Sequence, residues 1–308
     1  MQINRYSYPI ALAMRQFGTR VRVRGWERLL RFLFHPDLQS DFHFEIPFHG
    51  FRYPARADSI IDWNALFYGA YEAFELRVLA ALADTIDDAV FVDVGANVGH
   101  HALYMAAHAA GVHVLEPNPA LWARIEEKVG INGLDNMFIH KLGLGAENSL
   151  LPLYLGPESG EASRLMGASR TTAESNVEVS IVRGDDFFRE QSIGSVDIIK
   201  LDIEGAEADA LVGMDDSLAD WRPYIMLEIS ELGKCQFGAY ASFMDMFPEN
   251  YEVFLCRREP GLTVRLVTEP ADAATYSDYT GNAFCVPIEK RRQFIAAANL
   301  SMPVKLKG

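Results

Sequence analysis

The feature that most constrains the fold is a pair of apolar strands, each ending in residues that can hold a ligand. Residues 90–94 are apolar apart from Asp93, and they run into a turn bounded by Gly95 and Gly99 before a helix begins. Residues 112–116 form a second apolar run that ends on Glu116. Gly95 and Glu116 are 21 residues apart, a spacing typical of one helical crossover between neighbouring parallel strands. Both strand ends therefore open on the same edge of a sheet.

The glycine spacing of this turn indicates which kind of ligand it suits. A pyrophosphate-binding turn has its second glycine two residues after the first, whereas Gly99 comes four residues after Gly95. The N–H groups at this helix start favour a smaller anionic group such as an amino-acid carboxylate, and Asp93 is placed to meet an amine. Glu116 suits the two hydroxyls of a ribose. The pair predicts a nucleoside cofactor with an amino-acid group, the alternative being a turn that binds nothing.

A second group of charged residues lies at the end of a later strand, residues 196–201. Because side chains alternate along a strand, Lys200, Asp202 and Glu204 are expected on the same side of the strand end. A lysine beside two acids at the mouth of a sheet is costly to bury unless it is paired. Asp202 and Glu204 suit a general base or, together with Glu228 at the next strand end, a ligand set for a hard cation such as magnesium. The structural alternatives are an ion pair, a helix cap and a rim position for Glu228.

The order of elements divides the chain into two parts. Residues 1–72 combine helices, a hairpin over residues 42–57 and the start of a helix that is interrupted near Gly69. We expect them to form an N-terminal extension that serves as a lid or an oligomerisation surface. From residue 90 strands and helices alternate, which predicts a mainly parallel sheet covered on both faces. We expect residues 73–308 to form the cofactor-binding domain, with extra strands around residues 150–155 and 177–182, a loop over 156–176 and helices over 99–110 and 240–247.

Charge and cysteine content narrow the function. The chain carries −14, but residues 1–34 hold seven arginines and one acid, so this segment is +6 and the remainder −20. An acidic body argues against a nucleic-acid groove. The basic segment predicts a solvated helix face, with contact to a membrane surface or an acidic partner as alternatives. The three cysteines have no metal-type spacing, and no leader or membrane-spanning run is apparent, which favours a reduced, cytoplasmic protein.

Three motifs together, residues 91–99, 116–119 and 200–207, resemble the FkbM family of S-adenosylmethionine-dependent methyltransferases. The resemblance covers residues 68–230 well and extends more weakly to the hairpin and to residues 281–284. It implies the α/β, Rossmann-like fold of class I methyltransferases. That fold has a seven-stranded, mostly parallel sheet with helices on both faces and an antiparallel final strand, here preceded by the helical and hairpin extension.

The resemblance also implies which residues contact the cofactor. Residues at the first turn would hold its methionine part, Glu116 the ribose, and the segment after residue 141 the adenine. A segment before the first strand would close over the cofactor, and a small polar residue would lie in the variable loop, positioned by Asp185 and Asp186. The expected cofactor contacts are Tyr71, Glu72, Asp93, Gly95, Asn97, Gly99, Glu116, Pro117, Asn118, Leu142, Gly143, Ser163 and Asp202.

The expected activity is transfer of a methyl group from S-adenosylmethionine to a hydroxyl of a small metabolite, a sugar or a glycosylated natural product. Asp202, Glu204 and Lys200 are the expected catalytic residues, because Asp202 or Glu204 would take the hydroxyl proton or hold a Mg²⁺ ion that lowers its pKa. N-methylation on the same fold and a non-catalytic cofactor-binding scaffold are the alternatives. We expect a small-molecule acceptor, no nucleic acid and no transmembrane segment, with a homo-oligomer left open.

Overall fold

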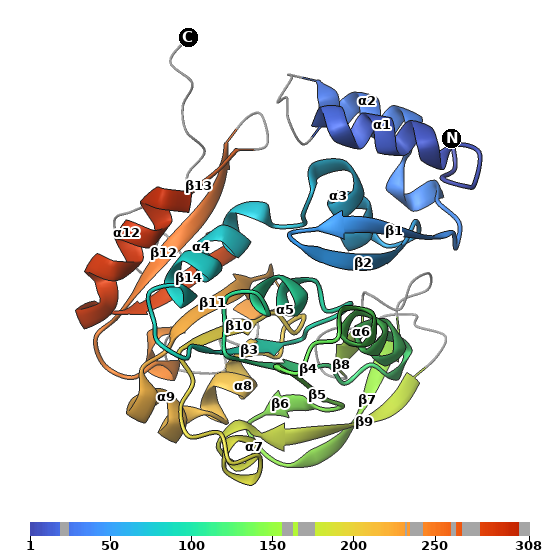
Figure 1. Ribbon diagram of the computed structural model, residues 1–308. Coiled ribbons are helices and arrows are strands. Elements are labelled where there is room, and N and C mark those ends of the chain that lie inside the picture. The colour runs from blue at the N-terminus through green and yellow to red at the C-terminus, as the bar shows by residue number, and fades with distance from the viewer. Residues whose placement is uncertain are drawn as a thin grey trace.

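The computed structural model describes residues 1–18, 25–155, 163–165, 176–231, 233–234, 243–259, 263–266 and 278–301. Within these residues the centre of the molecule is an eight-stranded sheet of order β13-β12-β14-β11-β10-β3-β4-β5 (Figure 1). Its strands are β3 (Val90–Val94), β4 (Gly111–Leu115), β5 (Met137–His140), β10 (Ile198–Leu201), β11 (Tyr224–Ile229), β12 (Tyr251–Glu259), β13 (Thr263–Leu266) and β14 (Gly281–Pro287).

The strand order confirms the expected fold class. Strands β5, β4, β3, β10 and β11 are parallel, while β14 lies between β11 and β12 and is antiparallel to both. A parallel sheet with one antiparallel strand inserted before its last member is the class I methyltransferase arrangement that the sequence motifs imply. The seven expected strands are present, and β13 adds an eighth at the edge by pairing with β12.

Helices cover both faces of this sheet, as expected (Figure 1). One apolar cluster contains residues of α4 (Ala73–Ala83), α5 (His100–Met105), α6 (Pro119–Asn132) and α12 (Arg291–Ser301). A second cluster contains residues of α7 (Gly184–Glu190), α8 (Glu207–Val212) and α9 (Asp215–Trp221). The expectation of a helix over residues 99–110 is wrong in length, because the N–H of Ala110 bonds to Ala89 O at 2.8 Å and draws the chain into β4.

A smaller sheet lies beside the carboxyl end of β5. It has the order β6-β9-β7-β8, with β6 (Gly143–Gly145), β7 (Ser149–Leu155), β8 (Ser163–Leu165) and β9 (Asn176–Arg183). The two extra strands expected from the sequence are therefore present. After His140 the chain leaves the central sheet and Gly143–Gly145 pairs in parallel with β9, where a Cβ added to Gly143 would lie 2.9 Å from Ile181 Cδ1. Most of the expected 156–176 loop lies outside the described residues, and the expected 240–247 helix is described only as η2 (Phe243–Met246), a 3₁₀ turn.

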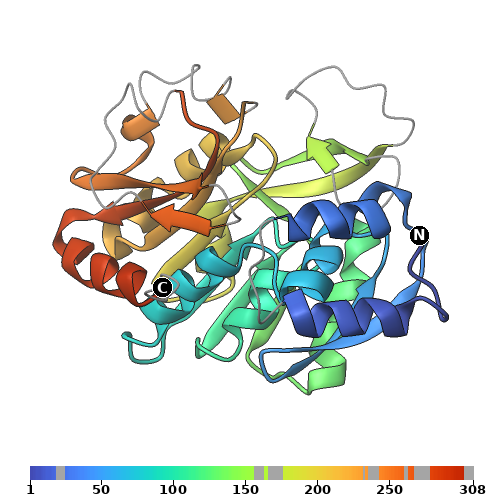
Figure 2. The ribbon, with the colours of Figure 1, turned by 90° about the horizontal axis from the view of Figure 1, so that it is seen from above.

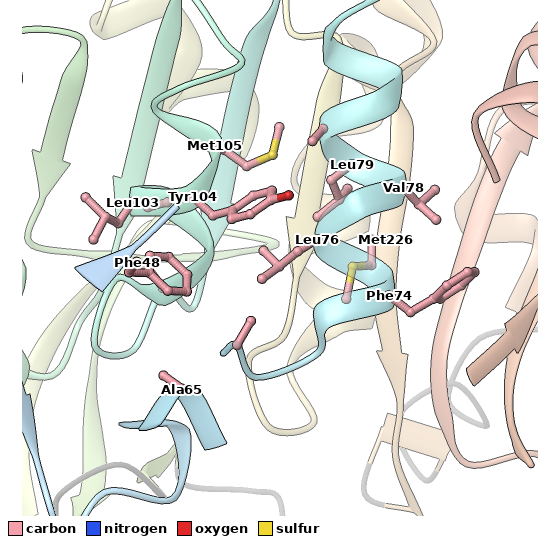
Figure 3. Packing of buried hydrophobic residues seen from close by; sticks show 14 of the residues in the cluster. Phe48, Ala65, Phe74, Leu76, Val78, Leu79, Leu103, Tyr104, Met105 and Met226 are labelled. Carbon is pink, nitrogen blue, oxygen red and sulfur yellow. The ribbon is translucent and has the colours of Figure 1, made fainter. Parts of the chain in front are cut away.

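The N-terminal extension packs against α5 and α6 on one face of the sheet (Figures 1 and 2). It comprises α1 (Tyr8–Gly18), α2 (Trp26–Leu33), η1 (Pro36–Leu38), the hairpin β1 (His43–Phe48) and β2 (Phe51–Arg56), and α3 (Ile60–Tyr68). Phe48 lies against His100 and Tyr104 of α5, with ring centroids 4.8 and 6.1 Å apart (Figure 3). Asn132 of α6 accepts from the N–H and donates to the carbonyl of Arg52, both at 2.8 Å.

The break between α3 and α4 occurs at the predicted position. Gly69 ends α3 with a φ of 90°, in the left-handed region where glycine has no steric penalty. Glu72 then precedes α4 with a φ of 49°, also left-handed, which is costly for a residue with a side chain. This break carries Tyr71 and Glu72 past the carboxyl edge of the sheet. Over the described residues, no helix has both the length and the apolar character needed to cross a bilayer.

Candidate cofactor and acceptor site

The glycine turn after β3 is held between the ends of two neighbouring strands. The N–H groups of Gly95 and Ala96 both donate to Leu115 O, at 3.0 and 3.1 Å. On the other side the turn touches the segment after β10, where a Cβ added to Gly95 would lie 1.9 Å from Asp202 O. Gly95 also has a φ of +76°. Both the backbone angle and the close approach therefore require glycine here.

Glu116 is a buried carboxylate at the end of β4 whose two oxygens are both held by backbone N–H groups. Its side chain is only 5% exposed, and its two oxygens accept from the N–H of Asn97 at 2.7 Å and from the N–H of Asn118 at 2.8 Å. Burial raises the pKa of Glu116 to about 7, although the two N–H donors oppose this shift. A carboxylate has about four acceptor positions, so its oxygens retain capacity for further donors such as ribose hydroxyls.

Lys200 joins the ends of β3 and β10. The side chain is 3% exposed, and its Nζ lies 3.1 Å from Asp93 Oδ1 and 3.5 Å from Asp202 Oδ2. It also donates to Gly95 O at 3.1 Å. Burial lowers the pKa of Lys200, but the charges of Asp93, Asp202 and Glu72 outweigh it and hold the pKa above its usual value. Lys200 therefore stays charged and fixes the relative position of the two strand ends.

Asp93 does not lie where the sequence pattern placed it. Its side chain is fully buried and lines neither of the cavities described below. Because Lys200 faces it at 3.1 Å, its charge is already matched within the protein. The expected contact between Asp93 and an amine of the ligand is therefore replaced by a contact with Lys200.

The segment after β10 is shaped by a buried glutamate. Glu207 is fully buried, and its Oε1 accepts from the N–H groups of Ile203 and Gly205, both at 3.1 Å. Glu204, between them, has a φ of 54°, so the regular alternation assumed from the sequence ends at Leu201. Lys200, Asp202 and Glu204 nevertheless border the same cleft, as predicted.

Glu72 is held by partners from two distant parts of the chain. Its Oε1 accepts from Asn282 Nδ2 of β14 at 2.6 Å, and its Oε2 lies 3.2 Å from His101 Nε2 of α5. Burial raises the pKa of Glu72, but His101 and Asn282 oppose it, and the net pKa lies below the usual value. Its neighbour Tyr71 is placed by His100, whose Nε2 lies 3.1 Å from Tyr71 N. Both residues border the cleft as expected.

Two cavities meet at the carboxyl edge of the sheet. The first, here called the strand-end cavity, has polar walls from the ends of β3, β4 and β10 and apolar walls from α6 and the smaller sheet. The second, the outer cleft, has a volume of about 810 Å³ and lies between the strand ends and the N-terminal extension. The residues that border both are Gly95, Asn97, Asp202 and Glu204.

Most expected site residues border one of these cavities. Four of them do not: Asp93 faces Lys200, Gly99 packs on Ile125, Asn118 is buried and caps α6, and Leu142 packs in the second apolar cluster. The side chain of Ser163 lies outside the described residues. Those that do border a cavity are Tyr71, Glu72, Gly95, Asn97, Glu116, Pro117, Gly143, Lys200, Asp202, Glu204 and Glu228.

The expected magnesium ligands are not gathered as a set. In the part of the chain that the structure describes, the one group of three acids with oxygens within 4.8 Å of one another is Asp185, Asp215 and Asp216. Of these, Asp185 accepts from Ser217 and pairs with Arg183, so it supports the smaller sheet. Glu228 instead has a pKa raised to about 8 by burial and by the charges of Asp202, Glu204 and other nearby acids.

Two sets of site residues escaped the sequence reasoning. Apart from Ile203, which lies within the motif 200–207, the missed apolar walls of the strand-end cavity come from α6 and the smaller sheet at positions outside the three motifs. Their burial patterns resemble those of any core strand or helix. The outer cleft also has a wall from the extension, and its only sequence signal was the position of that extension before the sheet. The missed residues are Leu121, Leu144, Leu153, Ile181 and Ile203 in the cavity, and Gln2, Pro36, Asp37, Leu38, Gln39, Asp41, Asp58, Ile60, Ile61, His100 and His101 in the cleft.

The strand order defines the class I methyltransferase fold, and a cavity lies at the carboxyl ends of β3 and β4. The family model for the Methyltransferase FkbM domain matches residues 93–253, just over half of the chain. The chain therefore belongs to the FkbM methyltransferase family. The match begins at Asp93 and includes the strand-end motifs around Glu116 and Asp202.

Several named relatives are similar to this chain. Methyltransferase 1 of Beauveria bassiana is 28% identical over 164 residues, which cover 47% of this chain and 66% of the relative. The hexuronic acid methyltransferase AglP of Haloferax volcanii is 26% identical over 156 residues, 48% of this chain and 59% of the relative. The 2-O-methyltransferase NoeI of Sinorhizobium fredii is 27% identical over 159 residues, 47% of this chain and 64% of the relative.

The similar region thus spans less than two thirds of each of these relatives. A solved structure, the methyltransferase FkbM from Methylobacillus flagellatus, aligns with a TM-score of 0.41 and 14% identity. The alignment covers 65% of this chain and 44% of that one.

Proposed function

We propose that this protein is an S-adenosylmethionine-dependent O-methyltransferase that acts on a hydroxyl of a sugar or glycosylated metabolite. The observation that carries the proposal is the junction of the strand-end cavity, which holds the buried carboxylate Glu116, with the larger polar outer cleft. The strand-end cavity has a volume of about 80 Å³, so a nucleoside cofactor would occupy it together with the adjoining part of the outer cleft, which it meets at Asp202. The rest of the outer cleft suits a polar acceptor. The names of AglP and NoeI, which specify a hexuronic acid and a 2-O position, support this acceptor class.

The residues of the strand-end cavity fit the proposed cofactor. Glu116 offers acceptor oxygens to a ribose, and the apolar side chains of Leu121, Leu144 and Ile181 form walls suited to an adenine ring. The turn at Gly95 and Asn97 reaches the shared border, where the methionine part would lie. When bound, S-adenosylmethionine supplies a methyl group that its own sulfonium has already activated.

The protein's own task is then to orient the acceptor hydroxyl and to remove its proton. We propose that Asp202 performs both, because it borders both cavities and its side chain is 34% exposed. Lys200 and the loop tied down by Glu207 hold Asp202 in place. We further propose that residues 1–72 act as a unit that closes the acceptor side, since η1 and α3 border the outer cleft.

The proposal is tested by calorimetry and by methyl transfer on the full chain. We expect S-adenosylhomocysteine to bind in the micromolar range or tighter and NAD⁺ not to bind, because the turn lacks the glycine spacing for a pyrophosphate. We also expect radiolabelled methyl groups to pass from S-adenosylmethionine to sugar hydroxyls. Tight NAD⁺ binding would point to an oxidoreductase. S-adenosylhomocysteine binding without transfer to any glycan would favour a scaffold.

The pKa of Glu116 predicts how cofactor binding depends on pH. Ribose hydroxyls donate to the ionised carboxylate, and protonation of Glu116 below a pKa of about 7 removes acceptor capacity. We therefore expect the Kd of S-adenosylhomocysteine to rise about tenfold from pH 8 to pH 6, as the ionised fraction falls. Calorimetry across this range measures the effect. In Glu116→Gln the Kd should be weaker and nearly independent of pH, and a wild-type Kd that is flat over this range would contradict the assignment.

A further inference from the structure

The outer cleft is built from two distant parts of the chain. Its inner wall is the carboxyl edge of the sheet, with Lys200, Asp202 and Glu228, and its outer wall is the extension around η1 and the start of α3. A volume of about 810 Å³ is near the upper end of the range for small-molecule sites, so the cleft has room for a sugar beside the methionine part of the cofactor at Gly95 and Asn97. The charges of these walls bear on which sugars fit.

Carboxylates dominate the charged groups that border the cleft. Of the described residues that border the cleft, Lys200 carries the one ammonium group, and it already lies against Asp93 and Asp202. The two histidines are also engaged, His101 with Glu72, and His100 with Tyr53 Oη and Tyr71 N, both at 3.1 Å. Besides Glu72, the acids along the cleft are Asp37, Asp41 and Asp58 on the outer wall and Asp202, Glu204 and Glu228 on the inner wall.

Among the described residues, the cations and histidines that pair with these acids are fewer than the acids themselves. Arg56, behind the outer wall, pairs with Asp58 at 2.6 Å and with Asp41 at 3.3 Å. The side chain of Asp37 is 78% exposed, and its Oδ2 lies 3.7 Å from Nδ1 of His35. On the inner wall, burial and then the charges of Asp202 and Glu204 raise the pKa of Glu228 to about 8, so its carboxyl is largely protonated at pH 7 while the cleft is empty. A cation bound beside it would favour the ionised carboxylate, whereas an anion would disfavour it further.

A bound divalent ion would be one way to supply that positive charge, but the geometry does not favour it. Across the described residues, no three of these cleft acids bring oxygens within 4.8 Å of one another. The carboxylates are instead spread over opposite walls, a spacing that suits an extended organic molecule with several polar groups. Such a molecule would donate hydrogen bonds to carboxylates along its whole length.

We propose that the acceptor is an amino sugar, a saccharide that carries a free protonated amine beside its hydroxyls, and that uronic acids are excluded. The inference rests on the proposed function, because it assigns the substrate class of the same site. It separates this chain from its relative AglP, whose name specifies a hexuronic acid. The amine binds among the cleft carboxylates, and a hydroxyl of the same molecule is placed at Asp202.

The proposal is tested with four β-1,4-linked disaccharides on one backbone. They are the dimer of glucosamine, its N-acetylated form, the neutral dimer of glucose and the dimer of glucuronic acid. Binding to the full chain saturated with S-adenosylhomocysteine is measured by ligand-observed NMR at pH 7. We expect the amine to bind at least about tenfold more tightly than its N-acetylated form, since each of its two amines can form a charged hydrogen bond that an acetamide cannot, and one such bond is enough for this factor. The uronic acid should bind most weakly.

Variants show whether the cleft carries this preference. Asp37→Asn combined with Glu228→Gln should reduce the preference for the amine over the N-acetylated form to less than about threefold, while leaving the N-acetylated form's own affinity little changed. Asp220→Asn, an exposed acid of α9 outside both cavities, is the matched control and should keep the full preference.

The outcomes separate this inference from the proposed function. If the uronic or neutral disaccharide binds as tightly as the amine, or if the amine does not bind, the amino-sugar assignment is overturned while cofactor binding is untouched. If the chain fails to bind S-adenosylhomocysteine, the proposed function itself fails. A preference that persists in the double variant would also overturn the assignment to these carboxylates.

Discussion

Asp202→Asn is expected to lower kcat about 10³-fold while changing the Kd of S-adenosylhomocysteine less than about threefold. Asparagine has the size of aspartate but cannot take a proton from an acceptor hydroxyl. Asp202 lies where the strand-end cavity meets the outer cleft, so it is placed to act on the acceptor. Initial rates of radiolabelled methyl transfer and calorimetry with S-adenosylhomocysteine measure the two quantities separately.

The variant should fold normally. Asp202 is partly exposed, and buried Lys200 keeps Asp93 as an ionic partner at 3.1 Å. Asp220→Asn, made at an exposed position on α9, controls for the loss of one negative charge. Full activity in Asp202→Asn would end the proposed role. A parallel loss of cofactor binding and activity would show instead that Asp202 mainly holds the cofactor.

Gly95→Ala is expected to abolish measurable cofactor binding and to lower the free energy of unfolding by about 3 kcal/mol or more. An added Cβ would lie 1.9 Å from the carbonyl oxygen of Asp202 and 2.8 Å from Ile203 Cγ2, and the residue has a φ of +76°. Because the nearest atom is backbone, the turn and the segment after β10 would have to separate. That movement would deform the border between the two cavities.

Gly99→Ala is the matched control for this variant. Gly99 has nearly the same φ, +74°, but its nearest neighbour to an added Cβ is Ile125 at 3.4 Å, an ordinary contact. We expect a cost of about 1–2 kcal/mol from the backbone angle alone, with cofactor binding retained. Urea denaturation and calorimetry compare the two. Equal losses would show that the backbone angle, and not the approach to Asp202, makes Gly95 necessary.

The sequence predicted the parts of the site that depend on neighbouring residues. An apolar strand followed by a turn or a carboxylate is a local pattern, and parallel strands bring their carboxyl ends to one edge. Glu116, Gly95 and Asp202 therefore meet where they were expected. The hairpin and the break at Gly69 were equally local, since alternation and a left-handed glycine specify them without reference to the rest of the chain.

The predictions for Asp93 and Glu228 depended on residues far away in the sequence, and the structure differs from them. Asp93 was expected to meet a ligand amine, but Lys200, 107 positions later in the sequence, already occupies its carboxylate. Glu228 was a candidate metal ligand, but among the described residues its carboxylate is not part of any group of three acids with oxygens within 4.8 Å of one another.

By itself, then, the sequence determined the sheet, its cofactor edge and the family, because these follow from short-range patterns and fixed motif spacing. Only the tertiary structure decided which carboxylates are already paired within the protein and which border the outer cleft. It also decided that η1 and α3 of the extension form the far wall of that cleft. The physical reason is that burial, charge pairing and cavity shape depend on contacts between segments far apart in the chain, and local patterns do not encode those contacts.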